Sequence, residues 1–319
     1  MLDAVTIGES MILMDPIEDG PLDNVTGYRQ RVAGAESNFA IALSRLGLHS
    51  AWISRLGDDP FGRLVRERIE AEGVQVYASI DAEAPTGIYF KERRAPERVD
   101  VYYYRTGSAA SRLTPSDLPA DLFPRSRMFH FSGINLAIPG ELPRATLHAL
   151  ALARKHDVPV SFDPNLRPRL WDIDTARPVL LPMIQDLELL LTGESEIYAL
   201  LGENELPAVL RELARRRVRI AVIKRGGAGA IVASEGRVIS VAPAAPIRVI
   251  DSVGAGDAFN AGFVAGQLRG LSIEDSGRLG SATGAAALAG SGDYETLPDW
   301  ETAMSLAGSV AVATMEVAM

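Results

Sequence analysis

Residues 251 to 262 read Asp251-Ser-Val-Gly-Ala-Gly-Asp257-Ala-Phe-Asn-Ala-Gly262. The stretch follows an apolar run of β type, residues 247–250, and opens a helical pattern. Its small residues, 254–256, leave backbone N–H groups unobstructed at a helix N-terminus, where the helix dipole favours an anion. Asp257, directly beside them, can accept a proton, so the stretch predicts phosphoryl transfer to a hydroxyl. The alternative is a glycine-rich turn in which Asp257 is an ordinary first-turn helix residue.

Two stretches carry a family resemblance. Asp251-Ser-Val-Gly-Ala-Gly-Asp257 resembles the C-terminal signature of the ribokinase-like (PfkB) carbohydrate kinases, usually Asp-Thr-x-Gly-Ala-Gly-Asp, and Ser252 keeps the hydroxyl. Gly34-Ala35-Glu36-Ser37-Asn38-Phe39-Ala40 resembles their N-terminal signature, usually Gly-Gly-x-x-x-Asn-x-Ala, with Ala33 replacing the first Gly. On pattern alone, the second stretch fits better as a helix start that Ser37 or Asn38 caps.

The periodicity of the chain predicts an α/β fold. Short β-type runs lie at 5–8, 50–55, 127–131, 158–162, 187–191 and 219–224. Helical patterns lie between them at 36–46, 61–72, 142–155, 175–185 and 206–215. This alternation predicts a mainly parallel sheet with helices on both faces. After residue 250 the pattern predicts only helices, at 255–268, 273–289 and 299–313. The resemblance likewise implies one ribokinase-like domain over residues 1–319.

Two stretches interrupt the alternation. Residues 11–33 are polar and rich in turn residues, and residues 86–105 contain two β-type runs, 87–92 and 99–105, joined by a charged link with Pro96. The second stretch predicts a hairpin. Together, about 11–33 and 86–105, they predict a discontinuous β-lid over the carboxyl edge of the sheet. The alternative is a ribbon on the surface without a role in the site.

Composition narrows the function. The chain has 319 residues, 47% hydrophobic and 23% charged, with a net charge of −9, as in a globular α/β protein that does not bind nucleic acid. It has no cysteine, which excludes disulfides and thiolate chemistry, and its four histidines are scattered. We see no signal peptide and no membrane-spanning run, and therefore expect a cytoplasmic enzyme without membrane partners.

Side chains expected at the carboxyl ends of strands give further candidates. Asn165 and Arg167 follow a strand within Phe162-Asp163-Pro164-Asn165-Leu166-Arg167, where ligands collect in open α/β sheets. Strand periodicity puts Tyr103 and Arg105 on one face of the hairpin. A Tyr–Arg pair that faces a cleft suits a carboxylate, and the alternative is cross-strand packing.

A glycine-rich segment follows Lys224. Arg225-Gly226-Gly227-Ala228-Gly229 is not a dinucleotide fingerprint, because the next residues, 230–233, have strand character and complete no βαβ unit. A Rossmann oxidoreductase is therefore disfavoured. The segment is better explained as a glycine hairpin near a nucleotide.

The resemblance implies roles for individual residues. It implies a catalytic set of Asp257, Gly254, Ala255 and Gly256. It implies substrate contacts by Gly34, Asn38, Tyr89, Tyr103, Arg105, Arg167 and Asp293, and a bracing or substrate role for Asp251. It implies ATP contacts by Asn165, Lys224, Gly226, Gly227, Gly229, Gly254 and Gly256. It implies that Glu196 contacts Mg²⁺, although Gly193 stands where Asn is usual and a helix dipole alone can explain Glu196.

Within the family, the chain most resembles the 2-keto-3-deoxygluconate kinases. The resemblance rests on Gly8-Glu9-Ser10-Met11, Tyr103-x-Arg105 and Asp163-Pro164-Asn165-x-Arg167. It implies a sugar-acid substrate, ATP, Mg²⁺ and a homo-oligomer formed through the β-lid. The alternatives are a fructokinase, a ribokinase or a 5-dehydro-2-deoxygluconokinase, and, from another class, a nucleotide-binding regulator without turnover.

Overall fold

The structure is a computed structural model that describes residues 1–95, 98–244 and 249–317. Its large sheet has ten strands in the order β14-β13-β12-β11-β10-β9-β8-β1-β4-β5. They are β1 (Ala4–Ile7), β4 (Ser50–Gly57), β5 (Gln75–Asp81), β8 (Phe129–Ser132), β9 (Val160–Asp163), β10 (Leu189–Gly193), β11 (Ile220–Lys224), β12 (Ala230–Ser234), β13 (Arg237–Val241) and β14 (Val312–Thr314). The strands from β11 to β5 are parallel, and β12, β13 and β14 are antiparallel to their neighbours.

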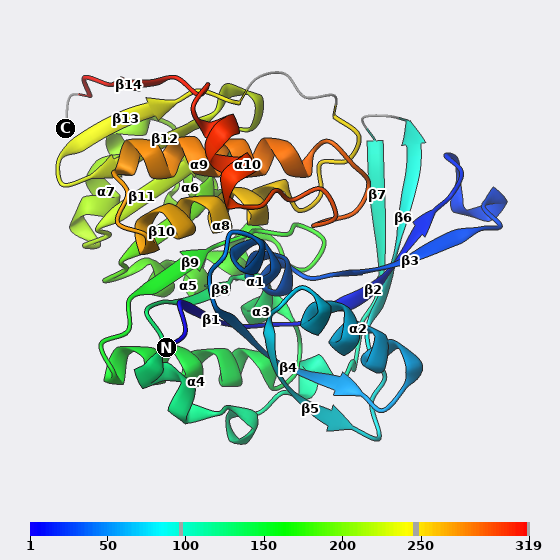
Figure 1. Cartoon of the computed structure of the whole chain (residues 1–319). Coiled ribbons are helices and arrows are strands. Elements are labelled where there is room, and N and C mark those ends of the chain that lie inside the picture. Colours follow the sequence, from blue (N-terminus) through cyan, green and yellow to red (C-terminus); the bar gives the residue numbers. More distant parts are fainter. Residues whose placement is uncertain (96–97, 245–248, 318–319) are drawn as a thin grey trace.

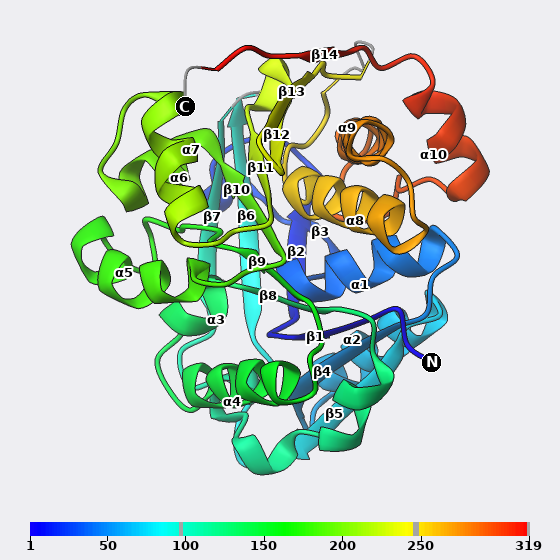
Figure 2. The ribbon, with the colours of Figure 1, turned by 90° about the vertical axis from the view of Figure 1, so that its left-hand side faces the viewer.

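Helices cover both faces of this sheet (Figure 2). They are α1 (Ala35–Arg45), α2 (Pro60–Ala71), α3 (Ile134–Ala137), α4 (Leu142–Lys155), α5 (Ile173–Leu180), α6 (Glu194–Leu201), α7 (Leu206–Arg215), α8 (Ala255–Leu268), α9 (Ile273–Ala287) and α10 (Trp300–Ala307). Side chains alternate between two cores, so Leu189 and Leu191 pack on the side of α1 and α8, and Leu190 on the side of α4 and α6. The prediction of a mainly parallel sheet between two helical layers is confirmed.

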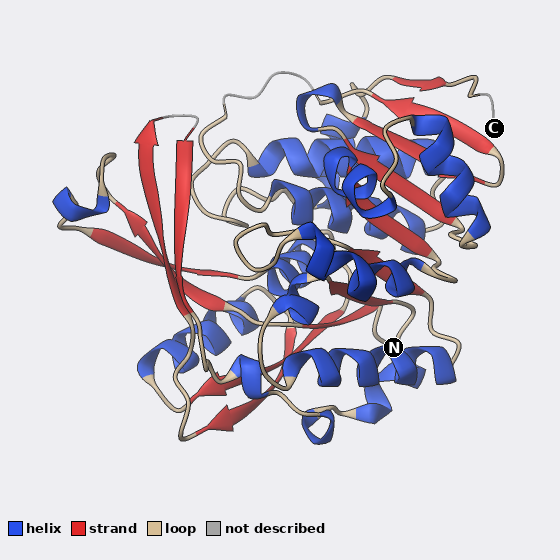
Figure 3. Cartoon of the chain, turned by 180° about the vertical axis from the view of Figure 1, so that it is seen from behind, coloured by secondary structure: helices blue, strands red, loops and turns tan. Residues whose placement is uncertain are grey.

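A second sheet of four strands stands beside the body (Figures 1 and 3). Its order is β3-β2-β6-β7, with β2 (Met11–Pro16), β3 (Tyr28–Ala33), β6 (Ile88–Ala95) and β7 (Arg98–Tyr104). We call this sheet the lid. The strands β6 and β7 pair antiparallel, and β2 and β6 pair in parallel, so the two predicted segments are neighbours in one sheet. Pro96 lies outside the described residues.

Three predictions about secondary structure are wrong. The predicted helix at 299–313 ends at Ala307, because Gly308 favours a helix end and the β-branched Val312 and Thr314 pair with β13 as strand β14. The helix predicted at 175–185 ends at Leu180 and continues as a 3₁₀ turn, since Pro182 cannot donate a helical hydrogen bond. Of the predicted run 247–250, residues 249 and 250 are exposed and lie in no strand, and the other two lie outside the described residues.

Within the described residues, no helix is both long enough and apolar enough to span a membrane.

Candidate active site

The segment 251–257, which we call the anion loop, ends at the N-terminus of α8. Gly254 is the N-cap residue, with φ +81° in the left-handed region that glycine adopts without strain. A Cβ atom there would lie 2.5 Å from the carbonyl oxygen of Asp293, so no larger residue fits. The first N–H groups of α8, from Ala255 to Asp257, have no acceptor within the helix. Since Gly256 is exposed, these groups form a site that can hold an anion.

Asp257 lies at this helix start with its side chain almost fully buried. Its Oδ2 accepts a hydrogen bond of 3.0 Å from Nδ2 of Asn38. Burial raises the pKa of Asp257 to about 7, although the hydrogen bond from Asn38 and the charge of Arg167 oppose the shift. A carboxylate with a pKa near neutrality, beside an anion site, is suited to accept a proton from a hydroxyl.

The N-terminal signature brings Asn38 to this point. Helix α1 begins at Ala35 with Gly34 as its N-cap, so neither Ser37 nor Asn38 is the N-cap residue, although Oδ1 of Asn38 accepts from the N–H of Gly34 over 3.4 Å. Both lie in the first turn, and Nδ2 of Asn38 donates to Asp257 and, over 3.2 Å, to Oδ2 of Asp293. A Cβ atom at Gly34 would lie 2.3 Å from the carbonyl oxygen of Glu9, which explains why glycine is needed at the helix start.

A pocket opens between the lid and the body, in front of Asp257. Residues from both parts line it: Glu9, Met11, Ala33, Gly34, Ala35, Glu36, Asn38, Tyr89, Val101, Tyr103, Arg105, Ile134, Arg167, Val253, Gly254, Asp257 and Asp293. The structure therefore brings together Gly34, Asn38, Tyr89, Tyr103, Arg105, Arg167, Gly254, Asp257 and Asp293 from the predicted set. Asp251 lies behind this pocket, where its Oδ1 accepts from the Val253 N–H over 3.0 Å.

Two arginines of the pocket differ in their surroundings. Nε of Arg105 donates to Oε2 of the buried Glu9 over 2.8 Å, and the Arg105 guanidinium lies 5.5 Å from the ring centre of Tyr103. Arg167 is exposed and makes no ion pair within the described part of the chain. Its charge is therefore available to a bound anion, whereas the charge of Arg105 is already balanced by Glu9.

The other predicted residues lie on the far side of the anion loop, at the carboxyl ends of β9, β10 and β11. Nζ of Lys224 donates to Oδ2 of Asp163 and to Oδ1 of Asn260, each over 2.9 Å. It would lie 3.7 Å from a Cβ atom at Gly256, which puts its charge close to the helix start. Asn165 is buried and left-handed with φ +41°, and its N–H donates to Asp163.

The glycine segment after Lys224 is the turn between the antiparallel strands β11 and β12. Gly226, Gly227 and Ala228 form a single 3₁₀ turn, and Gly229 follows with φ +81°. A Cβ atom at Gly227 would meet no atom within 4 Å, so this turn presents an open backbone surface. The interpretation as a glycine hairpin agrees with the structure, although the pocket described above does not reach it.

Glu196 lies in the first turn of α6. Its Oε2 accepts from the N–H of Gly193, the N-cap residue, over 2.8 Å. Burial and the charge of Asp163 raise the pKa of Glu196. Glu196 therefore stabilises the start of α6, whether or not it binds a metal. A cation beside it would offset the free-energy cost of burying its negative charge.

Sequence reasoning missed several buried polar residues. Glu9 pairs with Arg105, and Glu36 accepts hydrogen bonds from the N–H and Oγ of Ser132. Lys91, on β6, reaches Asp251 and Asp293. A signal for Lys91 was present, because strand periodicity puts it on the same face of the predicted hairpin as Tyr89. No comparable signal pointed to Glu36.

Comparisons with known proteins identify the family of the chain. The model of the pfkB family carbohydrate kinases matches residues 1–300. The chain is 36% identical over 306 residues to the 2-dehydro-3-deoxygluconokinase of Bacillus subtilis, with 94% of both chains covered. It is 35% identical over 303 residues to the 2-dehydro-3-deoxygluconokinase of Thermoproteus tenax, with 93% of this chain and 92% of the relative covered.

Solved structures show the same fold. The 2-dehydro-3-deoxygluconokinase of Thermotoga maritima superposes with a TM-score of 0.88 over 97% of this chain and 100% of that chain, at 26% identity. The predicted ribokinase-like fold is thereby confirmed. The two signatures, the fold and the family match together show that the chain belongs to the pfkB family of carbohydrate kinases.

Proposed function

We propose that this carbohydrate kinase transfers the γ-phosphate of ATP to the terminal hydroxyl of 2-keto-3-deoxygluconate and forms the 6-phosphate. The observation that carries the proposal is the position of Asp257, which faces a pocket lined by Arg105 and Arg167 and lies at the start of α8. A base, an anion site and positive charge for a sugar acid thus meet in one place. The names of the relatives support the same substrate.

The reaction needs one proton transfer and one phosphoryl transfer. Asp257 accepts the proton of the substrate hydroxyl as its oxygen forms a bond to the γ-phosphorus. The bond from that phosphorus to the bridging oxygen breaks, and ADP leaves with the electron pair. The N–H groups at the start of α8 stabilise the charge on the transferred group, and Lys224, which pairs with Asp163 and lies near Gly256, offers N–H donors on the nucleotide side.

The substrate carboxylate distinguishes a sugar acid from a neutral sugar. We assign its recognition mainly to Arg167, because Glu9 already balances Arg105. Arg105 keeps N–H donors beyond those that face Glu9 and lies against Tyr103, so it contributes hydrogen bonds and position rather than net charge. The hydroxyl of Tyr89, whose pKa burial raises well above its usual value, stays protonated and can donate to the sugar.

The residues on the nucleotide side fit magnesium. Burial beside Asp163 raises the pKa of Glu196, so a divalent cation there would be electrostatically favourable. Within the described residues, no three acidic or histidine side chains gather as a metal site. Glu196 would therefore hold Mg²⁺ together with phosphate oxygens and water. When bound, the ion would neutralise charge on the phosphates of ATP.

The experiment is ADP release from MgATP with purified protein, with 2-keto-3-deoxygluconate, fructose and ribose compared at equal concentration. We expect a strong preference for the keto acid, and a rise in KM of about 10- to 100-fold for the keto acid in Arg167→Met. The surface variant Arg144→Met is the matched control. A preference for a neutral sugar would contradict the substrate, and ATP binding without turnover on any sugar would favour a regulator.

The remaining proposals concern the domain organisation, the cellular location and the oligomeric state of the protein. We propose that the chain acts as one domain with a discontinuous lid, in the cytoplasm, where ATP is available. We also propose that it forms a homo-oligomer through the lid, because Tyr104 on β7 is 68% exposed and Ile17, directly after β2, is 64% exposed. Light scattering after size-exclusion chromatography tests the last point, and a monomer at micromolar concentration contradicts it.

A further inference from the structure

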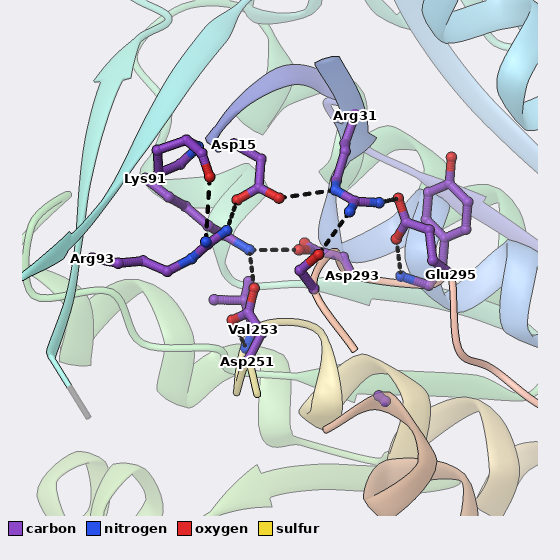
Figure 4. Close-up of polar contacts among 12 residues, drawn as sticks. Asp15, Arg31, Lys91, Arg93, Asp251, Val253, Asp293 and Glu295 are labelled. Carbon is purple, nitrogen blue, oxygen red and sulfur yellow. Dashed lines mark hydrogen bonds and ion pairs between the residues drawn. The ribbon is translucent and has the colours of Figure 1, made fainter. Parts of the chain in front are cut away.

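Lys91 is a lid residue whose ammonium group lies inside the body of the protein. Its side chain has no exposed surface. Nζ donates to Oδ2 of Asp251 over 2.8 Å and to Oδ1 of Asp293 over 3.1 Å, as Figure 4 shows. Burying an ammonium group is costly unless carboxylates pair with it. Here, although burial lowers the pKa of Lys91, the two carboxylates outweigh it and raise the pKa, so the group is charged.

Each of the two carboxylates accepts a further hydrogen bond close to the reacting groups. Oδ1 of Asp251 accepts from the Val253 N–H over 3.0 Å and so shapes the turn that leads into Gly254. Oδ2 of Asp293 accepts from Asn38, the residue that also donates to Asp257. The backbone of Asp293 also packs against Gly254, where it leaves no room for a Cβ atom. One hydrogen bond therefore connects Asp251 to the turn at Val253 within the anion loop, and one connects Asp293 to Asn38, the partner of the base.

Without the ammonium, two buried carboxyl groups, those of Asp251 and Asp293, would face each other. Burial raises the pKa of Asp293 even with Lys91 present, and the charge of Asp251 adds to this effect. Loss of the positive charge would therefore force a protonation or push Asp251 and Asp293 apart. Either change would displace the turn at Val253 or the amide of Asn38.

The other cationic side chains of the lid make different contacts, so their roles can be distinguished from that of Lys91. Arg31 joins the lid to the body through Glu295 over 2.5 Å and Ser291 over 2.7 Å, without reaching Asp251 or Asp293. Arg93 pairs with Asp15 inside the lid. Figure 4 shows these arginines beside Lys91, which points to the anion loop. Tyr89, two residues before Lys91 on β6, lines the pocket.

We infer that Lys91 is a positioning residue, a tethered ammonium ion that holds the anion loop and the Asn38–Asp257 pair in their reactive arrangement. The same lid strand then contacts the substrate through Tyr89 and orders the loop through Lys91. The inference rests on the proposed kinase function, since it gives the anion loop its role in phosphoryl transfer. It predicts that the wild-type protein needs no dissolved monovalent cation to order this loop.

The test compares Lys91→Met with Arg31→Met. We expect Lys91→Met to lower kcat by about 10- to 100-fold with a KM for the sugar within about threefold of wild type. Ammonium chloride should restore part of the kcat, because a free ammonium ion can enter between Asp251 and Asp293, whereas tetramethylammonium chloride at equal ionic strength should not. Arg31→Met should show no ammonium rescue. Arg93→Met serves as a control within the lid, with kcat near that of wild type.

A second measurement does not depend on turnover. Amide hydrogen exchange of the peptide over residues 251–257 should be faster in Lys91→Met than in wild type or Arg31→Met. Asp251→Asn, which keeps an acceptor for Val253, should show a smaller increase and remains informative if Lys91→Met does not fold. A folded Lys91→Met with wild-type kcat, a kcat loss that ammonium does not reverse, or unchanged exchange in both variants would overturn the inference. An inactive wild type would instead contradict the proposed function, and the exchange data would still decide the role of Lys91.

Discussion

Asn38 donates a hydrogen bond of 3.0 Å to Asp257, which lies 219 positions away in the chain. This bond joins the two signature stretches at the point where the hydroxyl of a substrate must lose its proton. It also lowers the pKa of a carboxyl group that burial raises, so the pKa of Asp257 stays near 7. The pKa of the base is therefore set by burial, which raises it, against the amide of Asn38 and the charge of Arg167, which lower it.

The first prediction concerns the base itself. Asp257→Asn keeps the size of the side chain but removes its ability to accept a proton. We expect kcat to fall by about 10²- to 10⁴-fold while the unfolding midpoint stays close to that of wild type. The matched control is Asp275→Asn, because Asp275 is also a first-turn helix acid but lies on the surface, at the start of α9. Near-normal turnover in Asp257→Asn would contradict the assignment of Asp257 as the base.

The second prediction concerns pH. Asp257 acts in its deprotonated form, and its pKa is about 7. We therefore expect log(kcat/KM) to rise with a slope of one below pH 7 and to level off above it. Initial rates of ADP release between pH 5.5 and 9, at fixed ionic strength, measure this limb. A flat profile across that range contradicts the role of Asp257 as the base.

The third prediction concerns Asn38. Asn38→Leu removes the hydrogen bond that lowers the pKa of Asp257, so the ascending limb should move to higher pH. We expect a loss in rate at pH 7 of about tenfold, with partial recovery at pH 9. Asn135→Leu is the control, since Asn135 is a buried asparagine that donates to the backbone of Ile7 instead. An unshifted limb in Asn38→Leu would show that this hydrogen bond does not tune the base.

The fourth prediction concerns stability. Burial raises the pKa of Glu36 from 4.5 to about 7. A carboxyl group with a raised pKa in the folded state stabilises the fold below its unfolded pKa, and this contribution is lost as pH rises through 7. The free energy of unfolding should therefore fall between pH 5 and pH 8, by at most about 3 kcal/mol from Glu36. Asp257 contributes a fall of the same sign.

Urea denaturation at the two pH values measures the difference. Glu36→Gln keeps an acceptor for Ser132 and should show a smaller fall than wild type, with the rest due to the other carboxyl groups whose pKa is raised, Asp257 among them. Glu70→Gln, on the exposed face of α2, is the control and should behave as wild type. An equal pH dependence in Glu36→Gln and wild type would mean that Glu36 is charged in the folded protein at all these pH values.

The sequence predicted the features that depend on local pattern. The glycine run before Asp257 forms the start of α8 because small residues, a helical pattern and an acid follow one another in the chain. Tyr103 and Arg105 share the pocket face because strand periodicity alone decides it. The lid could also be predicted from local pattern, because two β-type runs joined by a charged link indicate a hairpin, and residues 11–33 likewise interrupt the alternation of strands and helices.

Other features depend on pairing across the chain, which pattern does not reveal. Arg105 meets Glu9 across 96 positions, and Lys91 meets Asp251 across 160. Such pairs form when the lid and the body are brought together, so neither local sequence identifies the partner, although strand periodicity does put Lys91 on the same face as Tyr89. The prediction of a helix at 299–313 was wrong for a different reason. The alanine-rich end of this segment is compatible with a helix or a strand, and pairing with the free edge of β13 makes it a strand.

The parallel pairing of β2 with β6 has a consequence for folding. The whole of β4, α2 and β5 lies between these two strands in the chain, so no local hairpin can nucleate their contact. Joining distant segments costs chain entropy before any contact compensates it. We expect the lid to assemble last and to open first under denaturant. Tyr89 and Arg105 reach the pocket, and Lys91 reaches Asp251 and Asp293, only once the lid sheet is complete. We therefore expect a nascent or partly unfolded chain to lack its sugar-binding wall and to have no activity.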